Sequence, residues 1–195
     1  YMAAMTELSH TLMAGIALSL GLEGSYFADR YTADPLTLFR VFNYPKPALN
    51  EHAAWGVGEH TDYGLLTILK QDDSGGLQVK SKGGWPNSEW IAAPPIENTF
   101  VCNIGDMLDR MTGGLYRSTP HRVRNQSSRD RLSFPFFFDP NFNAEVNAIQ
   151  LGSQVRDDHQ ERWDKTSVHE FNGTYGDYIL GKVSKVFPQL QRAML

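Results

Sequence analysis

The sequence lacks several features that would mark a secreted, membrane-bound or nucleic-acid-binding protein. Cys102 is the only cysteine among the 195 residues, so no disulfide can form within the chain and a cytoplasmic location is expected. No apolar run is long enough to cross a bilayer, because glycine, serine or charged residues interrupt each one. Basic residues are not in excess, since 18 Lys and Arg against 22 Asp and Glu leave a net charge of −4. We therefore expect neither a membrane nor a nucleic acid as a partner.

The composition that remains is that of a globular protein. A length of 195 residues, with 41% hydrophobic and 21% charged residues, fits one domain with an apolar core, which we expect to be monomeric. The first residue is Tyr1 rather than Met, and it stands within an apparently helical pattern. We therefore expect a part of the protein to precede it.

The apolar pattern predicts a helix, then many strands, then a second helix. Apolar residues from Met5 to Leu20 recur at spacings of three and four, which is typical of one helix face. Short runs rich in β-branched and aromatic residues follow, separated by turn clusters. The predicted strands are 36–42, 64–69, 77–80, 89–92, 99–104, 118–124 and 131–138. The final helix is predicted over 175–187. This order favours a sandwich or barrel over alternating βα units.

Two histidines and an aspartate form a candidate metal site. His60 and Asp62 are two residues apart, so in extended structure both side chains can point at one atom. A His-x-Asp pair is also common in loops with no ligand. His121, on a separate predicted strand, would complete a set of two histidines and one carboxylate, which suits non-haem Fe(II) because it leaves positions open opposite. Zinc hydrolases accept the same ligands, so the triad does not choose the metal.

The last predicted strand has two different faces. Its even-numbered residues are all apolar and are expected to pack against a helix or sheet; they are Leu132, Phe134, Phe136 and Phe138. The odd face begins with Arg131 and Ser133, which are costly to bury unless an anion meets them. A guanidinium and a nearby hydroxyl together suit a carboxylate. An exposed arginine at a strand end is the alternative, and Pro135 could introduce a bulge that ends the alternation.

Taken in order, these residues resemble a known family. The motifs are His60-Thr61-Asp62, His121, Arg131-x-Ser133, Asn43-Tyr44-Pro45, Gly75-Gly76-Leu77-Gln78-Val79 and Asn103-Ile104-Gly105-Asp106. They resemble the isopenicillin N synthase-like family of Fe(II)/2-oxoglutarate-dependent dioxygenases over nearly the whole chain. The resemblance implies a mainly β fold with flanking helices (α+β), namely a cupin-like double-stranded β-helix, or jelly roll.

The resemblance also implies how the chain is organised. It would be a single catalytic domain over 1–195. Residues 1–34 would form a leading helix and connection, residues 36–140 the jelly-roll core, and residues 141–195 a loop and the C-terminal helix. The N-terminal segment usual in the family would be missing from this sequence.

By the same resemblance, His60, Asp62 and His121 would hold Fe(II). Arg131 and Ser133 would bind the distal carboxylate of 2-oxoglutarate, with the phenol of Tyr44. With O₂ as the oxidant, 2-oxoglutarate would be decarboxylated to succinate and CO₂ while a small organic metabolite is hydroxylated or desaturated. Halogenation is disfavoured, because related halogenases lack the carboxylate that Asp62 supplies.

Two residues are candidates for contacts with the substrate. Alternation places Arg40 on the face of Phe42 and Tyr44, so Arg40 can meet an anionic or carbonyl group; a solvent-facing arginine fits equally well. Phe137 shares the face of Arg131 and can pack against a flat substrate or within the core. Phe42 itself stands where many plant-type members have asparagine.

Two other functions remain open on this sequence. One is a ferrous oxidase of the same family that does not consume 2-oxoglutarate, as isopenicillin N synthase and aminocyclopropane-carboxylate oxidase do not. The other is a metal-binding jelly roll without turnover. The substrate itself cannot be deduced, because variable loops and termini build the substrate pocket in this family.

Overall fold

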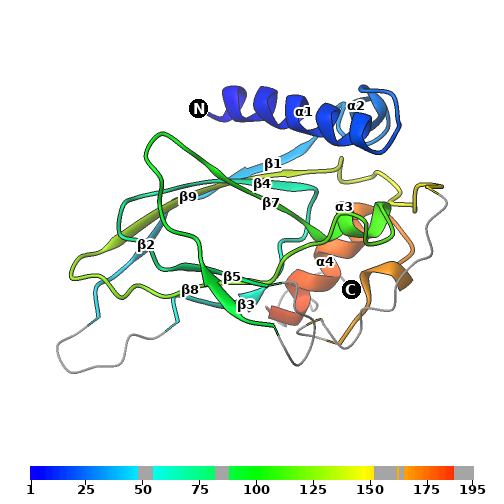
Figure 1. Ribbon diagram of the computed structural model, residues 1–195. Coiled ribbons are helices and arrows are strands. Elements are labelled where there is room, and N and C mark those ends of the chain that lie inside the picture. Colours follow the sequence, from blue (N-terminus) through cyan, green and yellow to red (C-terminus); the bar gives the residue numbers. More distant parts are fainter. Residues whose placement is uncertain (48–54, 82–87, 152–161, 163–164, 187–195) are drawn as a thin grey trace.

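The computed structural model describes residues 1–47, 55–81, 88–151, 162 and 165–186, which form two antiparallel β-sheets flanked by helices (Figure 1). The helices are α1 (Met2–Ser19), α2 (Tyr26–Arg30), α3 (Asp106–Met111), the 3-10 helix η2 (Val168–Glu170) and α4 (Tyr175–Val186). The strands are β1 (Leu36–Phe39), β2 (Phe42–Tyr44), β3 (Val57–His60), β4 (Leu66–Gln71), β5 (Leu77–Lys80), β6 (Trp90–Ala92), β7 (Val101–Ile104), β8 (His121–Val123) and β9 (Arg131–Asp139). No helix in the described part is both long and apolar enough to cross a membrane.

The larger sheet has five strands, in the order β1-β9-β4-β7 with β2 also pairing with β9. Strands β1 and β2 meet β9 in the same register, since Phe39 lies opposite Phe136 and Phe42 opposite Ser133. Pro135 is paired with Leu69 of β4 within an unbroken ladder. The possible bulge at Pro135 is therefore not formed, and the odd residues of β9 keep one face along the whole strand.

Helix α1 covers the outer face of the larger sheet, as Figure 1 shows. The even residues Phe136 and Phe138 of β9 are completely buried in the core that α1 joins, as predicted, whereas Leu132 is exposed and Phe134 only half-buried, so the apolar face is packed only in the second half of the strand. The most buried line of α1 differs from the predicted stripe, since it runs through Met5, Ser9, Met13 and Ala17. Ser9 is tolerated there because its hydroxyl donates to the backbone oxygen of Met5.

The smaller sheet has the order β3-β8-β5-β6 and lies across from the larger one. Every predicted strand overlaps an observed one, but the single strand predicted over 36–42 is divided into β1 and β2, and several others are shorter than predicted. Strand β3 was not predicted, because Gly58 and Glu59 interrupt any apolar alternation there. It nevertheless pairs with β8 and places His60 directly opposite His121.

Helices α3 and α4 close one end of the two sheets (Figure 1). The carboxylates of Asp106 and Asp109 on α3 are buried and form ion pairs with Arg162 at 2.8 and 2.9 Å. Tyr178 of α4 donates to Asp106 at 2.6 Å. The segment after the sheets is thus fixed to α3 by buried polar contacts, and α3 itself follows the strand β7 that lines the site.

Candidate metal and cosubstrate site

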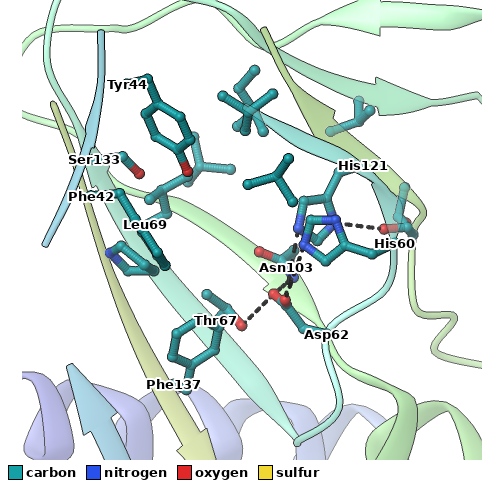
Figure 2. A pocket seen from close by; sticks show the side chains of 17 residues that line it. Phe42, Tyr44, His60, Asp62, Thr67, Leu69, Asn103, His121, Ser133 and Phe137 are labelled. Carbon is teal, nitrogen blue, oxygen red and sulfur yellow. Dashed lines mark hydrogen bonds and ion pairs between the residues drawn. The ribbon is translucent and has the colours of Figure 1, made fainter. Parts of the chain in front are cut away.

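The three predicted metal ligands come together between the sheets. His60 ends β3, Asp62 follows it in the turn before β4, and His121 begins β8. One ligand atom from each residue lies within 4.8 Å of the other two. The Nε2 atoms of His60 and His121 lie 3.8 and 3.7 Å from Oδ1 of Asp62 (Figure 2). The arrangement is a compact set of two imidazoles and one carboxylate on one side of a cavity.

Backbone carbonyls orient both imidazoles. Nδ1 of His60 lies 2.9 Å from the oxygen of Gly58, and Nδ1 of His121 lies 3.1 Å from the oxygen of Thr119. A proton on each Nδ1 leaves Nε2, the ring nitrogen near Oδ1 of Asp62, with a lone pair that can bind a metal. Burial, and after it the neighbouring ring of His121, lowers the pKa of His60. Both effects favour the neutral imidazole, which is the form that binds a metal.

Thr67 and Asn103 hold the second oxygen of Asp62, and sequence reasoning gave neither a role. The Thr67 hydroxyl donates to Oδ2 at 2.6 Å, and the Asn103 amide donates to the same atom at 2.7 Å (Figure 2). The two donors are cross-strand partners in β4 and β7. The signal that could have found them is strand alternation, which puts Thr67 on the same face as Leu69.

Arg131 is completely buried and keeps one donor unused. Its Nε donates to the backbone oxygen of Gly75 at 2.5 Å, and its Nη2 donates to Oε1 of Gln71 at 3.1 Å. Nη1 is also buried and has no hydrogen-bond partner within the described part of the chain. A buried guanidinium N–H without a partner is costly, so an anion that reaches it is strongly favoured. Burial lowers the pKa of Arg131, but from a value so high that the group stays charged.

Tyr44 and Ser133 lie beside this guanidinium. The Tyr44 ring centre is 5.1 Å from the Arg131 guanidinium carbon, and Tyr44 is paired with Arg131 in the β2–β9 register. Burial raises the pKa of Tyr44, so its phenol remains a hydrogen-bond donor at neutral pH. Ser133 is two residues along β9 on the same face, and it is buried too. The predicted carboxylate-binding residues therefore lie together.

One cavity joins the two groups of residues. Its volume is about 140 Å³. Its wall includes all three candidate metal ligands, both donors to Asp62, and Tyr44 and Ser133 (Figure 2). The rest of the wall is mostly apolar, and the predicted substrate contact Phe137 belongs to it. Arg40 is exposed and does not line the cavity, although its register places it next to Pro135, which does.

The residues present fit a metal ion and a dicarboxylate. Two nitrogen ligands and one carboxylate oxygen on one side leave further positions open, as Fe(II) oxygenases require. The unpaired N–H of Arg131, with the neighbouring hydroxyls of Ser133 and Tyr44, suits a carboxylate. Residues 36–140 match the family model described as the 2OG-Fe(II) oxygenase superfamily. The chain belongs to this superfamily. The match confirms the predicted family, in which 2-oxoglutarate, iron and O₂ are the expected cosubstrates and metal.

Curated relatives agree with this assignment. The chain is 56% identical to a probable iron/ascorbate oxidoreductase of Dictyostelium discoideum over 100% of its own length and 57% of the relative. It is 45% identical to a 1-aminocyclopropane-1-carboxylate oxidase of the same organism, over 96% of the chain and 58% of that protein. The chain thus spans less than two thirds of the length of these relatives.

Solved structures confirm the predicted jelly-roll fold. A full-length protein of Neurospora crassa, solved in complex with alpha-KG and 5-formyluracil, superposes with a TM-score of 0.72 at 30% identity. The superposition covers 93% of this chain and 57% of the Neurospora protein. The superfamily fold therefore extends over nearly all of the chain, including the strands that carry the candidate site.

Proposed function

We propose that the protein is a non-haem Fe(II)- and 2-oxoglutarate-dependent dioxygenase that hydroxylates or desaturates a small organic metabolite. The observation that carries this proposal is a single cavity walled by the His60, Asp62 and His121 triad and by Ser133 and Tyr44, next to the unpaired Nη1 of Arg131. A metal site alone would suit several enzymes. A metal site in a cavity whose wall carries Ser133 and Tyr44 suits one whose cosubstrate carries a carboxylate, because the buried guanidinium of Arg131 lies beside Tyr44 even though it does not itself line the cavity.

Each residue has a specific part in this proposal. His60, Asp62 and His121 hold Fe(II), which with 2-oxoglutarate and O₂ supplies the oxidising chemistry and yields succinate and CO₂. Arg131 and Ser133 bind the distal carboxylate, and Tyr44 donates its phenol to it. The apolar wall keeps water from the reacting positions, which protects a strong oxidant from side reactions.

The test is O₂ uptake and succinate formation by the purified protein with Fe(II), with and without 2-oxoglutarate. A panel of small acids, phenolics and peptides supplies candidate substrates. We expect succinate only when 2-oxoglutarate is added, and loss of it in His121→Gln. The matched control is His10→Gln, because His10 lies on α1 and contacts Phe138 rather than the site. If the protein neither binds Fe(II) nor forms succinate, the proposal is wrong and a jelly roll without turnover is the remaining function.

A second candidate is a ferrous oxidase that does not consume 2-oxoglutarate. The 45% identity to a 1-aminocyclopropane-1-carboxylate oxidase favours it. The same assay separates the two functions, because such an oxidase takes up O₂ without forming succinate. The buried guanidinium of Arg131 does not separate them, because its unpaired nitrogen suits the carboxylate of a substrate as well as that of 2-oxoglutarate.

We also propose that the substrate carries an anionic group, which Arg40 binds at the cavity rim while Phe137 packs on the substrate body. Arg40 lies in the connection between β1 and β2 and places its guanidinium 5.9 Å from the Phe42 ring. No ion pair of Arg40 occurs among the residues that the structure describes. Arg40→Ala is expected to weaken binding of an acidic substrate and spare its amide, whereas Arg30→Ala on α2 leaves both unchanged. Equal affinities in parent and Arg40→Ala would refute this contact.

We also propose a cellular location and a class of partner for the protein. The single cysteine and the net charge of −4 support a cytoplasmic protein that acts on small molecules rather than on nucleic acids or membranes. We propose a monomer with the domain organisation given above, in which 36–140 is the catalytic core. Light scattering of the purified protein tests the oligomeric state, and a mass of twice the chain would refute it.

A further inference from the structure

Oδ2 of Asp62 accepts two short hydrogen bonds, both from one cross-strand pair. Thr67 and Asn103 stand opposite each other in β4 and β7, and both side chains point from the larger sheet toward the carboxylate. Asp62 follows β3 of the smaller sheet. The carboxylate is therefore held by residues of the sheet opposite the one that carries the two histidines.

These contacts divide the carboxylate into two unlike halves. Oδ2 accepts from a hydroxyl at 2.6 Å and from an amide at 2.7 Å, which occupies both of its favourable acceptor directions. Oδ1 faces Nε2 of His60 and Nε2 of His121. Rotation of the carboxylate about its Cβ–Cγ bond would break both bonds, so Oδ1 is fixed as the oxygen that points at the metal position.

We infer that Thr67 and Asn103 are positioning residues that hold Asp62 as a ligand through one oxygen only. This inference rests on the proposed metal site. A carboxylate that binds through both oxygens fills one more coordination position of a six-coordinate metal, and that position is then lost to cosubstrate or O₂. The cross-strand pair thus keeps open the side of the metal where the proposed chemistry takes place.

A purely structural role for the pair makes a different prediction. If Thr67 and Asn103 serve only to satisfy a buried carboxylate, removing them lowers the stability of the metal-free protein and leaves the spectrum of bound Co(II) unchanged. If they are positioning residues, removing them weakens metal binding and changes the coordination geometry around the metal. Outer contacts of this kind change metal affinity by about 10- to 100-fold when removed.

The experiment measures Co(II) binding to the purified, metal-free protein by titration, together with the visible absorption spectrum of bound Co(II). Thr67→Val keeps the shape of the side chain and removes the hydroxyl, and Asn103→Leu does the same for the amide. We expect each variant to bind Co(II) about 10-fold more weakly and to change the absorption band. The affinity loss of the double variant is expected to be smaller than the product of the two single fold-changes, because both residues bind the same oxygen. Thr67→Ser restores the hydroxyl and is expected to recover the parent spectrum.

Thr37→Val is the matched control, because Thr37 lies opposite Phe138, on the outer face of the same sheet. It is expected to leave the Co(II) affinity and spectrum unchanged. Thermal unfolding of each metal-free variant shows whether it is folded at the titration temperature. Parent affinity and spectrum in both folded variants overturn the inference while leaving the proposed function intact. Failure of the parent protein to bind Co(II) overturns the proposed metal site and this inference together.

Discussion

Replacing Arg131 with Met tests the proposed cosubstrate site most directly. In the parent protein the guanidinium is completely buried, and its Nη1 has no partner in the described part of the chain. A carboxylate bound there would meet a fixed charge with little competition from water. Removing one partner of a buried ion pair leaves the other charge uncompensated, which costs about 3–5 kcal/mol. We therefore expect the Kd for 2-oxoglutarate to rise by about 10²- to 4 × 10³-fold.

The substitution also affects the folded protein without ligand. It leaves Oε1 of Gln71 and the backbone oxygen of Gly75 without their donor, at about 1–3 kcal/mol each. It also removes a buried charge, which offsets part of this loss. Binding and unfolding must therefore be measured on the same preparation, so that a weakened fold is not mistaken for a lost binding site.

The assay is calorimetric titration of 2-oxoglutarate into the Co(II)-loaded protein in the absence of O₂. Arg30→Met is the control, because Arg30 lies on α2 and contacts the Tyr26 ring. A folded, metal-loaded Arg131→Met protein that binds 2-oxoglutarate within about threefold of the parent Kd would refute the role of the guanidinium, since a threefold change is only about 0.7 kcal/mol.

Three further substitutions test one buried carboxyl group and two glycines. Burial raises the pKa of Asp139, which accepts from Tyr175, to about 7. The folded state keeps a proton on Asp139 that the unfolded state releases above about pH 4, so the free energy of unfolding falls as pH rises from about 4 to 7, by about 4 kcal/mol in all. Urea unfolding of Asp139→Asn should therefore show a flatter dependence of this free energy on pH than the parent. An equal slope in the two proteins would contradict this. A Cβ at Gly105 would overlap the backbone oxygen of Gly64, so Gly105→Ala should lower the unfolding free energy by about 1–3 kcal/mol. Gly15→Ala on α1 meets no atom within 4 Å and should raise it by about 0.5–1 kcal/mol, and the opposite order of the two thermal midpoints would refute the comparison.

Much of the fold could be predicted from local sequence patterns. Strands such as β5 and β9 carry β-branched or aromatic runs bounded by turn residues, and their predicted ranges agree with the structure to within a residue. Strand β3 and helix α3 could not be predicted in this way. The first is four residues long with a glycine and a charge inside it. The second has six residues, all buried, so no polar face marks its helical period.

In the candidate site, the metal ligands could be predicted from the sequence, whereas the contacts that support them could not. The positions of His60, Asp62 and His121 followed from residue spacing and family resemblance, and the structure places them within reach of one atom. Contacts such as those of Gln71 with Arg131 and of Asn103 with Asp62 depend on strand register between segments far apart in the sequence. No local pattern sets that register, which is decided by the packing of whole sheets.

Strand register also explains why the site and the core are specified together. In the ladder between β4 and β9, Thr67 lies opposite Phe137 and Gln71 opposite Ser133. One strand pairing therefore sets the position of Thr67, which donates to Asp62, and that of Ser133, the proposed cosubstrate-binding residue. A slip of β9 by one residue would turn Ser133 and Phe137 to the outer face and bring Phe136 into the cavity. The same slip would remove Phe136 from the core under α1, where it is completely buried, at a cost of about 3–5 kcal/mol by analogy with its truncation. Packing of aromatic residues such as Phe136 on the outer face therefore fixes the register that orients Ser133 and Phe137 toward the cavity.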